Sequence, residues 1–395
     1  MINVGRFQVR IAAFWRWSSN AVTFGANGTS GPASREIIER SSMSERNCLV
    51  TGGAGFIGSA LSQQLVSRFD KVVAVDCLHP QIHAKQTRPA ALHPGVELVV
   101  GDVCDATVWD NVLASFRPEV VVHLAAETGT GQSLTEATRH AHTNVVGTTA
   151  MLDAFMRHDA KPKRIVLSSS RAVYGEGAWQ GNEGGSLFYP GQRSVSQLAA
   201  GKWNFDGFPV AMEADRVHPA PVSVYGATKL AQEHVISSWA NAVGTEYVIL
   251  RLQNVFGPGQ SLINSYTGIV SLFCQLARKK QSIPLYEDGM VMRDFILIDD
   301  IAAALFAAST VTGISGRVFD IGSGVATTLL QLAEKIAALY GAPAPEVVGK
   351  YRFGDVRHAF TSAEGAKGLG WAPKHDLDYG LKVLAQWIEG ELQHV

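Results

Sequence analysis

The sequence lacks an excess of charge of either sign, a close cysteine pair and an apolar run of membrane-spanning length. Its 395 residues include 34 Lys and Arg against 35 Asp and Glu, so the composition does not indicate a nucleic-acid partner. Four cysteines lie far apart without a CxxC spacing, which argues against a disulfide framework or a metal site. We therefore expect a cytoplasmic protein with reduced thiols and no membrane insertion.

The first 45 residues lack acidic side chains until Glu36. Such a composition suits a transit peptide, although Arg10 and Arg16 interrupt any apolar run that could cross a membrane. The alternative, which we favour, is an upstream start codon, with Met43 as the natural beginning before the first strand. In either case residues 1–45 are expected to be a poorly ordered N-terminal extension.

From Asn47 onward, short β-rich runs alternate with amphipathic helical patterns. This alternation predicts an α/β fold, a Rossmann-type doubly wound parallel sheet with a smaller C-terminal substrate-binding lobe. We predict a cofactor domain over 46–255 with an insertion at about 176–221, and a lobe over 256–395 that interleaves with it. The predicted strands are 47–51, 71–76, 96–100, 119–124, 164–169 and 246–250, and the predicted helices are 56–69, 105–115, 132–158, 223–243, 265–280, 299–310 and 327–340.

A glycine-rich turn, TGGAGFIG, follows the first predicted strand and opens the first predicted helix. Gly52, Gly55 and Gly58 allow a sharp turn and a close approach to a pyrophosphate, to which the helix N-terminus offers free N–H groups. The next strand ends in Asp76, 18 residues after Gly58, where a carboxylate can accept hydrogen bonds from the adenosine ribose. No arginine follows directly to bind a 2′-phosphate, so we predict NAD rather than NADP.

Two serines, a tyrosine and a lysine mark the expected position of the reaction. Ser168 and Ser170 end the fifth predicted strand, and ligands of such sheets lie beyond the carboxyl ends of the strands. Tyr225 and Lys229 stand four residues apart on a predicted helix and therefore share one face. Because a nearby ammonium lowers the pKa of a phenol, we expect Lys229 to make Tyr225 a general base.

These motifs, in this order, resemble an extended short-chain dehydrogenase/reductase of the NAD-dependent nucleotide-sugar epimerase/dehydratase family. The resemblance covers residues 46 to about 385. Besides the glycine turn, it is carried by the segments GDVCD, HLAAETG, SSSRAVYG, SVYGATK, LRLQNVFGPGQ, MRDFILIDD and YRFGDVRH.

The resemblance implies a role for each matching residue. Ser170 would hold the reacting sugar oxygen, Tyr225 would be the base, Lys229 would modulate the base and bind ribose, and Asn144 would steady the lysine. The cofactor-binding residues implied in this way are Gly52, Gly55, Phe56, Ile57, Gly58, Asp76, Asp102, Val103, Leu124, Ala125, Ala126, Asn144, Ser168, Tyr225 and Lys229.

The family also implies a site for the diphosphate of a nucleotide sugar. Asn254, Arg293 and Arg352 occupy the matching positions, and Arg357 is a weaker candidate. Arginine suits such a site, because a guanidinium group binds phosphate oxygens through bidentate hydrogen bonds.

The sequence departs from the family pattern in two places, and the first limits which reaction we expect. Sugar 4,6-dehydratases carry Asp-Glu after the catalytic hydroxyl and related decarboxylases carry Glu, but this chain has Arg171 and Ala172. Neither elimination nor decarboxylation then has its acid–base partner, whereas oxidation and re-reduction at C4 needs none. In addition, Tyr225 follows Ser170 by 55 residues, a long spacing, and we expect the extra segment to form a flap over the sugar. Gln192, Arg193 and Trp203 are its candidate contacts, although packing is the favoured role for Trp203.

Within the family, the chain most resembles the dTDP-L-rhamnose 4-epimerases of lipopolysaccharide O-antigen pathways. The expected function is NAD-dependent 4-epimerisation of a dTDP- or UDP-sugar, first of all dTDP-L-rhamnose to dTDP-6-deoxy-L-talose. The resemblance also implies a homodimer that pairs helices 132–158 and 223–243 of each copy. Two alternatives stay open: an NAD(P)H-consuming 4-keto-sugar reductase and a catalytically silent dinucleotide-binding regulator.

Overall fold

The computed structural model describes residues 46–83, 85–262 and 268–393. The predicted N-terminal extension, residues 1–45, lies outside the described residues, so its expected poor order stays a prediction.

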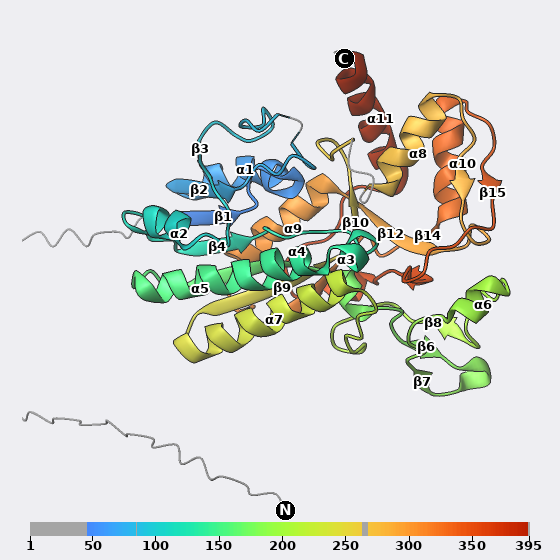
Figure 1. The fold of residues 1–395 in the computed structure, drawn as a ribbon, viewed down its shortest axis with the longest axis horizontal. Coiled ribbons are helices and arrows are strands. Elements are labelled where there is room, and N and C mark those ends of the chain that lie inside the picture. The colour runs from blue at the N-terminus through green and yellow to red at the C-terminus, as the bar shows by residue number, and fades with distance from the viewer. Residues whose placement is uncertain (1–45, 84, 263–267, 394–395) are drawn as a thin grey trace, which may run out of the picture. The chain divides into compact units, whose positions relative to one another are not determined.

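A seven-stranded parallel sheet forms the centre of the described fold (Figure 1). Its strand order is β13-β9-β5-β4-β1-β2-β3, so the chain builds one half outward from β1 and then crosses over to build the other. Val50 of β1 pairs with Ala74 of β2 on one side and with Val122 of β4 on the other. The strands are β1 (Asn47–Thr51), β2 (Lys71–Asp76), β3 (Val96–Val100), β4 (Val120–His123), β5 (Arg164–Ser170), β9 (Glu246–Leu252) and β13 (Arg317–Ile321).

Alternate residues of these strands face two separate layers of helices, because successive side chains of a strand point to opposite faces. In β1, Val50 packs with α1 and α9, whereas Leu49 packs with α2, α5 and α7. Figure 1 shows α5 and α7 side by side on one face of the sheet, with α1 and α9 on the other. The doubly wound α/β fold is therefore confirmed. The helices are α1 (Phe56–Arg68), α2 (Ala106–Leu113), α5 (Gly147–Arg157), α7 (Val224–Val243) and α9 (Ile298–Thr310).

A smaller lobe is built around one strand, β12, which pairs in parallel with β10 and β16 and antiparallel with β14. Its helices are packed around a separate apolar core that includes Phe273, Leu332 and Leu384. The large sheet takes α9 and β13 from this later part of the chain, and the predicted domain boundary at residue 255 stays a prediction. The elements of the lobe are β10 (Asn254–Phe256), α8 (Ile269–Arg278), β12 (Met292–Leu297), β14 (Ala326–Thr328), α10 (Leu329–Tyr340), β16 (His358–Ala359) and α11 (Leu377–Gln393); β11 (Pro284–Leu285) and β15 (Glu346–Val347) pair beside it.

The helix predicted over 132–158 is interrupted once and contains a π-helical turn, so it is not one regular α-helix. Glu136, with φ −122° and ψ 41°, separates α3 (Gln132–Thr135) from α4 (Ala137–Ala141). A π-helical turn, η1 (His142–Val146), then precedes α5. Such turns are frequent at functional sites, because the extra residue changes the direction of nearby side chains.

The insertion at about 176–221 has structure of its own. It contains a small antiparallel sheet, β7-β6-β8, and a short helix, α6 (Val195–Ala199). Backbone N–H groups tie it to the rest: Met212 donates to the carbonyl of Phe360, Ala214 to the carboxylate of Asp320, and Ala220 to the carbonyl of Val173. Its strands are β6 (Trp179–Gln180), β7 (Leu187–Phe188) and β8 (Phe208–Pro209), and the short 3-10 helices of the fold are η2 (Arg171–Tyr174), η3 (Asn182–Gly184) and η4 (Ala363–Ala366).

Candidate active site

The glycine turn lies against the end of β4 at distances that only glycine permits. Gly52 has φ +66°, and a Cβ added to it would lie 2.8 Å from the backbone nitrogen of Ala125. A Cβ on Gly58 would lie 2.5 Å from the carbonyl oxygen of Gly53. Gly55 precedes α1 and has no side chain to cap it, so the first N–H groups of the helix remain available. The turn therefore fits the diphosphate of a dinucleotide.

Asp76 ends β2 and is buried beside this turn. Its carboxylate accepts hydrogen bonds from the backbone N–H groups of Ala54, at 3.0 Å, and Leu78, at 2.8 Å. Because a carboxylate offers about four acceptor positions, ribose hydroxyls can still donate to it. Next to it along the sheet, Asp102 is exposed and accepts from the N–H of Cys104, and Val103 is buried.

Asn144 connects the loop after β4 to helix α7. Its amide oxygen accepts from the N–H of Glu127 at 2.7 Å, and its amide nitrogen donates to the hydroxyl of Thr228 at 2.9 Å. The π-helical turn carries Asn144 to this position. The contact that the structure gives is with the residue before Lys229 rather than with Lys229 itself.

The structure brings Ser170 and Tyr225 together although they are far apart in the sequence. Ser170 ends β5 and caps η2, while Tyr225 is the second residue of α7 and half-buried. Burial raises the pKa of the Tyr225 phenol above its ordinary value, and a hydrogen bond with Ser170 and the positive charge of Arg171 lower it. Arg171 is the cation that lowers this pKa among the protein groups. The expectation that Lys229, with bound NAD, makes Tyr225 a general base stays a prediction.

The ammonium of Lys229 points instead into a buried polar chain. It donates to the side-chain oxygen of Gln232, whose amide nitrogen donates to Thr148 at 2.9 Å and lies 3.2 Å from Nε2 of His123. Nδ1 of His123 is hydrogen-bonded with the hydroxyl of Thr51, at 2.6 Å, directly before the glycine turn. Burial lowers the pKa of His123 to about 3, so the imidazole is neutral. This chain of contacts fixes Lys229 relative to the cofactor turn.

The stability of the protein is expected to depend on pH through Lys229. Burial lowers its pKa to about 7, against an ordinary 10.5, while the Glu233 carboxylate opposes the shift. Between pH 7 and about 10.5 the unfolded chain binds a proton at this residue that the folded chain has released, so the free energy of unfolding rises with pH. Below pH 7 both states are protonated and the penalty of the buried charge is constant.

We expect the free energy of unfolding of wild type, minus that of Lys229→Met, to increase by about 4 kcal/mol over this pH window. Denaturant titrations of both proteins at pH 6.5, 8.5 and 10 measure it. A difference that stays flat or falls would contradict the assignment.

A small cavity beside Ser170 and Tyr225 is lined by two arginines. Arg171 from η2 and Arg293 from β12 face it, together with Thr130, Ser223 and Asp355. The Nε of Arg171 donates to the side-chain oxygen of Asn254 at 3.1 Å. From the sequence, Arg171 was predicted only to exclude elimination, and its place beside this cavity was missed. Its position directly after Ser170 was the available signal. The remaining lining residues are Ala172, Val222, Gly354 and Val356.

The other predicted diphosphate residue, Arg352, lies apart from this cavity. It is exposed, and its guanidinium stacks on the ring of Tyr286 at 5.1 Å. The structure thus brings together Asn254 and Arg293 of the predicted trio, whereas Arg352 is two residues from the nearest lining residue, Gly354.

Two arginines that the sequence offered as candidate contacts are structural. Arg193 and Arg357 are each 1% exposed at the side chain, and both form ion pairs with Glu287 at 2.9 Å. Arg193 also lies 3.3 Å from Glu176, and Arg357 pairs with Asp288. The predictions that Arg193 contacts sugar and that Arg357 binds phosphate are wrong, because these carboxylates already occupy both guanidinium groups.

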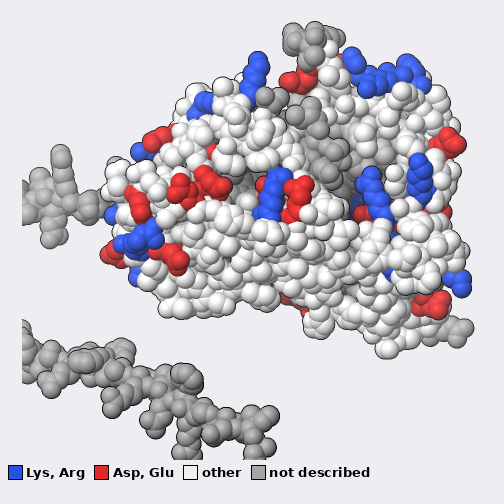
Figure 2. All heavy atoms as spheres, in the orientation of Figure 1, with Lys and Arg blue, Asp and Glu red and all other residues white. Residues whose placement is uncertain are grey.

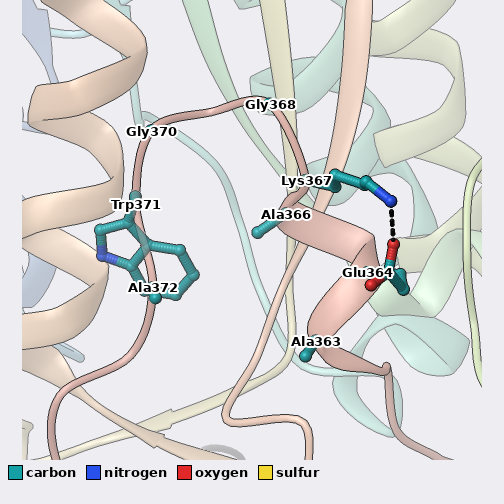
Figure 3. Close-up of a pocket in the computed structure, with 8 residues that line it drawn as sticks. All are labelled: Ala363, Glu364, Ala366, Lys367, Gly368, Gly370, Trp371 and Ala372. Atoms are coloured by element: carbon teal, nitrogen blue, oxygen red, sulfur yellow. Dashed lines mark hydrogen bonds and ion pairs between the residues drawn. The ribbon is translucent and has the colours of Figure 1, made fainter.

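A second hollow, between η4 and the loop up to Ala372, contains none of the predicted site residues (Figure 3). Figure 3 shows its polar groups, Lys367 and Glu364, joined in an exposed ion pair 2.8 Å long. It is an open depression rather than a reaction site. On the face shown in Figure 2, acidic and basic side chains are interspersed, so this face has no field of a single sign.

Comparison with known proteins decides the family. The model of the NAD dependent epimerase/dehydratase family matches residues 48–322, more than half of the chain. The chain belongs to this family. In this NAD dependent epimerase/dehydratase, the glycine turn follows β1, Ser170 ends β5 and Tyr225 lies at the start of α7. Within the described ranges, no helix has the length and apolar character to span a membrane, and no three His, Cys, Asp or Glu side chains group as metal ligands.

Relatives within the epimerase/dehydratase family agree over nearly their whole length. A dTDP-L-rhamnose 4-epimerase of Burkholderia thailandensis is 56% identical over 357 residues, 90% of this chain and 98% of the relative. The fold of a UDP-glucose 4-epimerase of Thermotoga maritima, solved with UDP-glucose, superposes with a TM-score of 0.72 at 28% identity, over 88% of this chain and 99% of that one. A UDP-glucose 4-epimerase of Thermus thermophilus, solved with NAD, gives a TM-score of 0.69 at 26% identity, over 87% and 99%.

Proposed function

We propose that this protein is an NAD-dependent nucleotide-sugar 4-epimerase that interconverts dTDP-L-rhamnose and dTDP-6-deoxy-L-talose. The observation that carries the proposal is the 56% identity, over 98% of its length, with a dTDP-L-rhamnose 4-epimerase. The site geometry supports it, because a serine and a tyrosine that share a hydrogen bond lie beside a cavity lined by two arginines.

The residues around the glycine turn fit NAD. Gly52, Gly55 and Gly58 would face its diphosphate, Asp76 its adenosine ribose, and Asp102 with Val103 its adenine. Leu124, Ala125 and Ala126 directly follow β4, Ser168 lies near the carboxyl end of the neighbouring β5, and Phe56 and Ile57 begin α1. When bound, NAD supplies the uptake and return of a hydride at one sugar carbon.

Tyr225 and Ser170 would handle the proton of the reaction. Tyr225 takes the proton from the C4 hydroxyl while Ser170 holds the same oxygen, and Tyr225 returns the proton when the hydroxyl re-forms. Lys229, fixed by Gln232, would bind the nicotinamide ribose close to Tyr225, with Asn144 acting through Thr228. After one full cycle, Tyr225 and Ser170 would therefore have the same protonation states as before it.

Inversion at C4 requires that the sugar ring turn while the nucleotide stays bound. Arg293 and Asn254 would anchor the diphosphate, with Arg352 closing on it from the segment before β16. No carboxylate follows Ser170, since Arg171 and Ala172 stand there, so the keto sugar has no partner for elimination. The insertion would then shield this intermediate from water.

The proposal is tested by incubating the purified protein with dTDP-L-rhamnose, and with other dTDP- and UDP-sugars, without added cofactor. We expect NMR to detect inversion at C4 of the dTDP-6-deoxyhexose, with no solvent deuterium at carbon. A requirement for stoichiometric NAD(P)H would favour the 4-keto-sugar reductase instead. Deuterium at C3 or C5 would mean epimerisation through an enediol.

The same proposal includes a homodimer in the cytoplasm that serves O-antigen synthesis. Helices α5 and α7, which lie side by side, would pair with those of a second copy in a four-helix interface (Figure 1). Both keep apolar side chains partly exposed, Met156 on α5 and Trp239 on α7. Light scattering of wild type and of Met156→Asp tests it: we expect a dimer that the substitution weakens, whereas a monomeric wild type would contradict it.

A further inference from the structure

Arg171 is the charged residue closest in sequence to the catalytic pair. It follows Ser170 directly and begins η2, so β5 and the cap of η2 fix its backbone. Its Nε donates to Asn254 on β10, at 3.1 Å, which turns the guanidinium toward the same cavity as Arg293. Three separate elements, η2, β10 and β12, therefore converge on one small space.

The two guanidinium groups at this cavity have no directly paired carboxylate among the described residues. Within the described part of the chain, neither Arg171 nor Arg293 forms an ion pair with a carboxylate; Arg293 donates to the carbonyls of Met292 and Val356 instead. By contrast, Arg193 and Arg357 nearby are each ion-paired. Two cations taken out of water side by side need an anion, because their mutual repulsion and desolvation oppose folding.

The balance of charge around the cavity supports this reading. Burial, with the repulsion of Arg293, lowers the pKa of Arg171 to about 9, and burial also lowers the pKa of Arg293. Asp355, which lines the same cavity, and Glu176 oppose both shifts, and Glu287 opposes that of Arg293. Glu176 and Glu287 are already engaged by Arg193. A diphosphate carries two negative charges and acceptor oxygens that match guanidinium forks.

We propose that Arg171 binds the substrate, and that with Arg293 it grips the phosphate attached to C1 of the sugar. The inference rests on the proposed function. Only one pyranose ring separates the C4 oxygen held by Ser170 from the C1 phosphate, so a residue next to Ser170 reaches both ends of the sugar. Arg171 would hold the C1 phosphate in place while the ring turns to present its other face at C4.

The test measures binding of nucleotides without the sugar, so that it does not depend on turnover. Calorimetry with the NAD-loaded enzyme compares thymidine diphosphate with thymidine monophosphate, and UDP with UMP. For Arg171→Gln we expect diphosphate affinity to fall by roughly 10- to 100-fold, and monophosphate affinity by less than about threefold. Arg171→Lys keeps the positive charge but cannot form two parallel hydrogen bonds, so its diphosphate affinity should lie between those of wild type and Arg171→Gln.

The control is Arg216→Gln, which removes an exposed arginine paired with Glu213 outside the cavity, and which should bind diphosphate as wild type does. Diphosphate binding by Arg171→Gln and Arg171→Lys equal to that of wild type would overturn the inference, as would an equal loss for monophosphate. If Arg171→Gln does not fold, Arg171→Lys alone decides. A wild type that binds diphosphate through Arg171 but does not epimerise dTDP-L-rhamnose would instead overturn the proposed function and leave this inference standing.

Discussion

Tyr225→Phe is expected to lower kcat by roughly 10²- to 10⁴-fold while the protein still folds and retains NAD. The phenol oxygen is the group that can take the C4 proton, since the hydroxyl of Ser170 is a far weaker base. The substitution removes one oxygen that hydrogen-bonds Ser170 and leaves the half-buried ring in place. Turnover is measured by NMR of the C4 configuration, and bound NAD by its absorbance after denaturation.

The matched control is Tyr379→Phe, which removes a phenolic hydroxyl from an exposed position on α11 and should change neither the rate nor the NAD content. Because Ser170 and Tyr225 act on one oxygen, the double variant Ser170→Ala/Tyr225→Phe should be scarcely slower than Tyr225→Phe alone. A Tyr225→Phe enzyme within tenfold of wild type would contradict the proposed role of the phenol.

Gly58→Ala is expected to abolish NAD retention and to lower the free energy of unfolding by about 1–3 kcal/mol. The added methyl would lie 2.5 Å from the carbonyl oxygen of Gly53 and 2.6 Å from its Cα, and both are backbone atoms that cannot turn aside. Helix α1 must then move away from the turn, and the N–H groups at its start lose their alignment. The ratio of NAD to protein and a denaturant titration measure the two effects.

Gly390→Ala is the matched control, because Gly390 lies in helix α11 and a Cβ there meets nothing within 4 Å. We expect it to retain NAD and to gain a few tenths to about 1 kcal/mol, since alanine restricts the unfolded chain and favours the helix. Full NAD retention by Gly58→Ala would mean that the turn tolerates the methyl group and that the packing argument is wrong.

The sequence was sufficient for six of the seven strands of the large sheet, because parallel strands buried on both faces leave runs rich in Val, Leu and Ile. The seventh strand, β13, was not predicted. The sequence was also sufficient for the pairing of Ser170 with Tyr225, since the order of a doubly wound fold places the end of β5 beside the start of α7. Both inferences depend on local patterns and on the rule that ligands lie at the carboxyl edge of such a sheet. Strand formation and the order of the elements depend on residues close together in the chain, so a single sequence is enough to predict them.

The features that sequence analysis missed depend on contacts between distant segments. The break at Glu136 leaves no sign, because the apolar pattern of 132–158 continues across it. Arg352 and Arg357 looked alike as phosphate ligands, and Arg193 looked like a sugar contact. Only the fold shows that Glu287 pairs with Arg193 and Arg357 while Arg352 stacks on Tyr286. Arg171 was missed for the opposite reason. It is a candidate phosphate ligand because it has no carboxylate partner among the described residues, and no local sequence pattern shows that.

The position of β13 at the edge of the large sheet limits how enzymes of this kind can be recombined. A fragment that stops at residue 255 would leave β9 with an uncovered edge, and it would also lose α9, whose Ile301 and Leu305 cover one face. Exposed strand edges of this kind promote aggregation. Grafting a different sugar specificity onto this scaffold therefore requires chimeras that exchange loops around α9 and β13 and leave both elements in place.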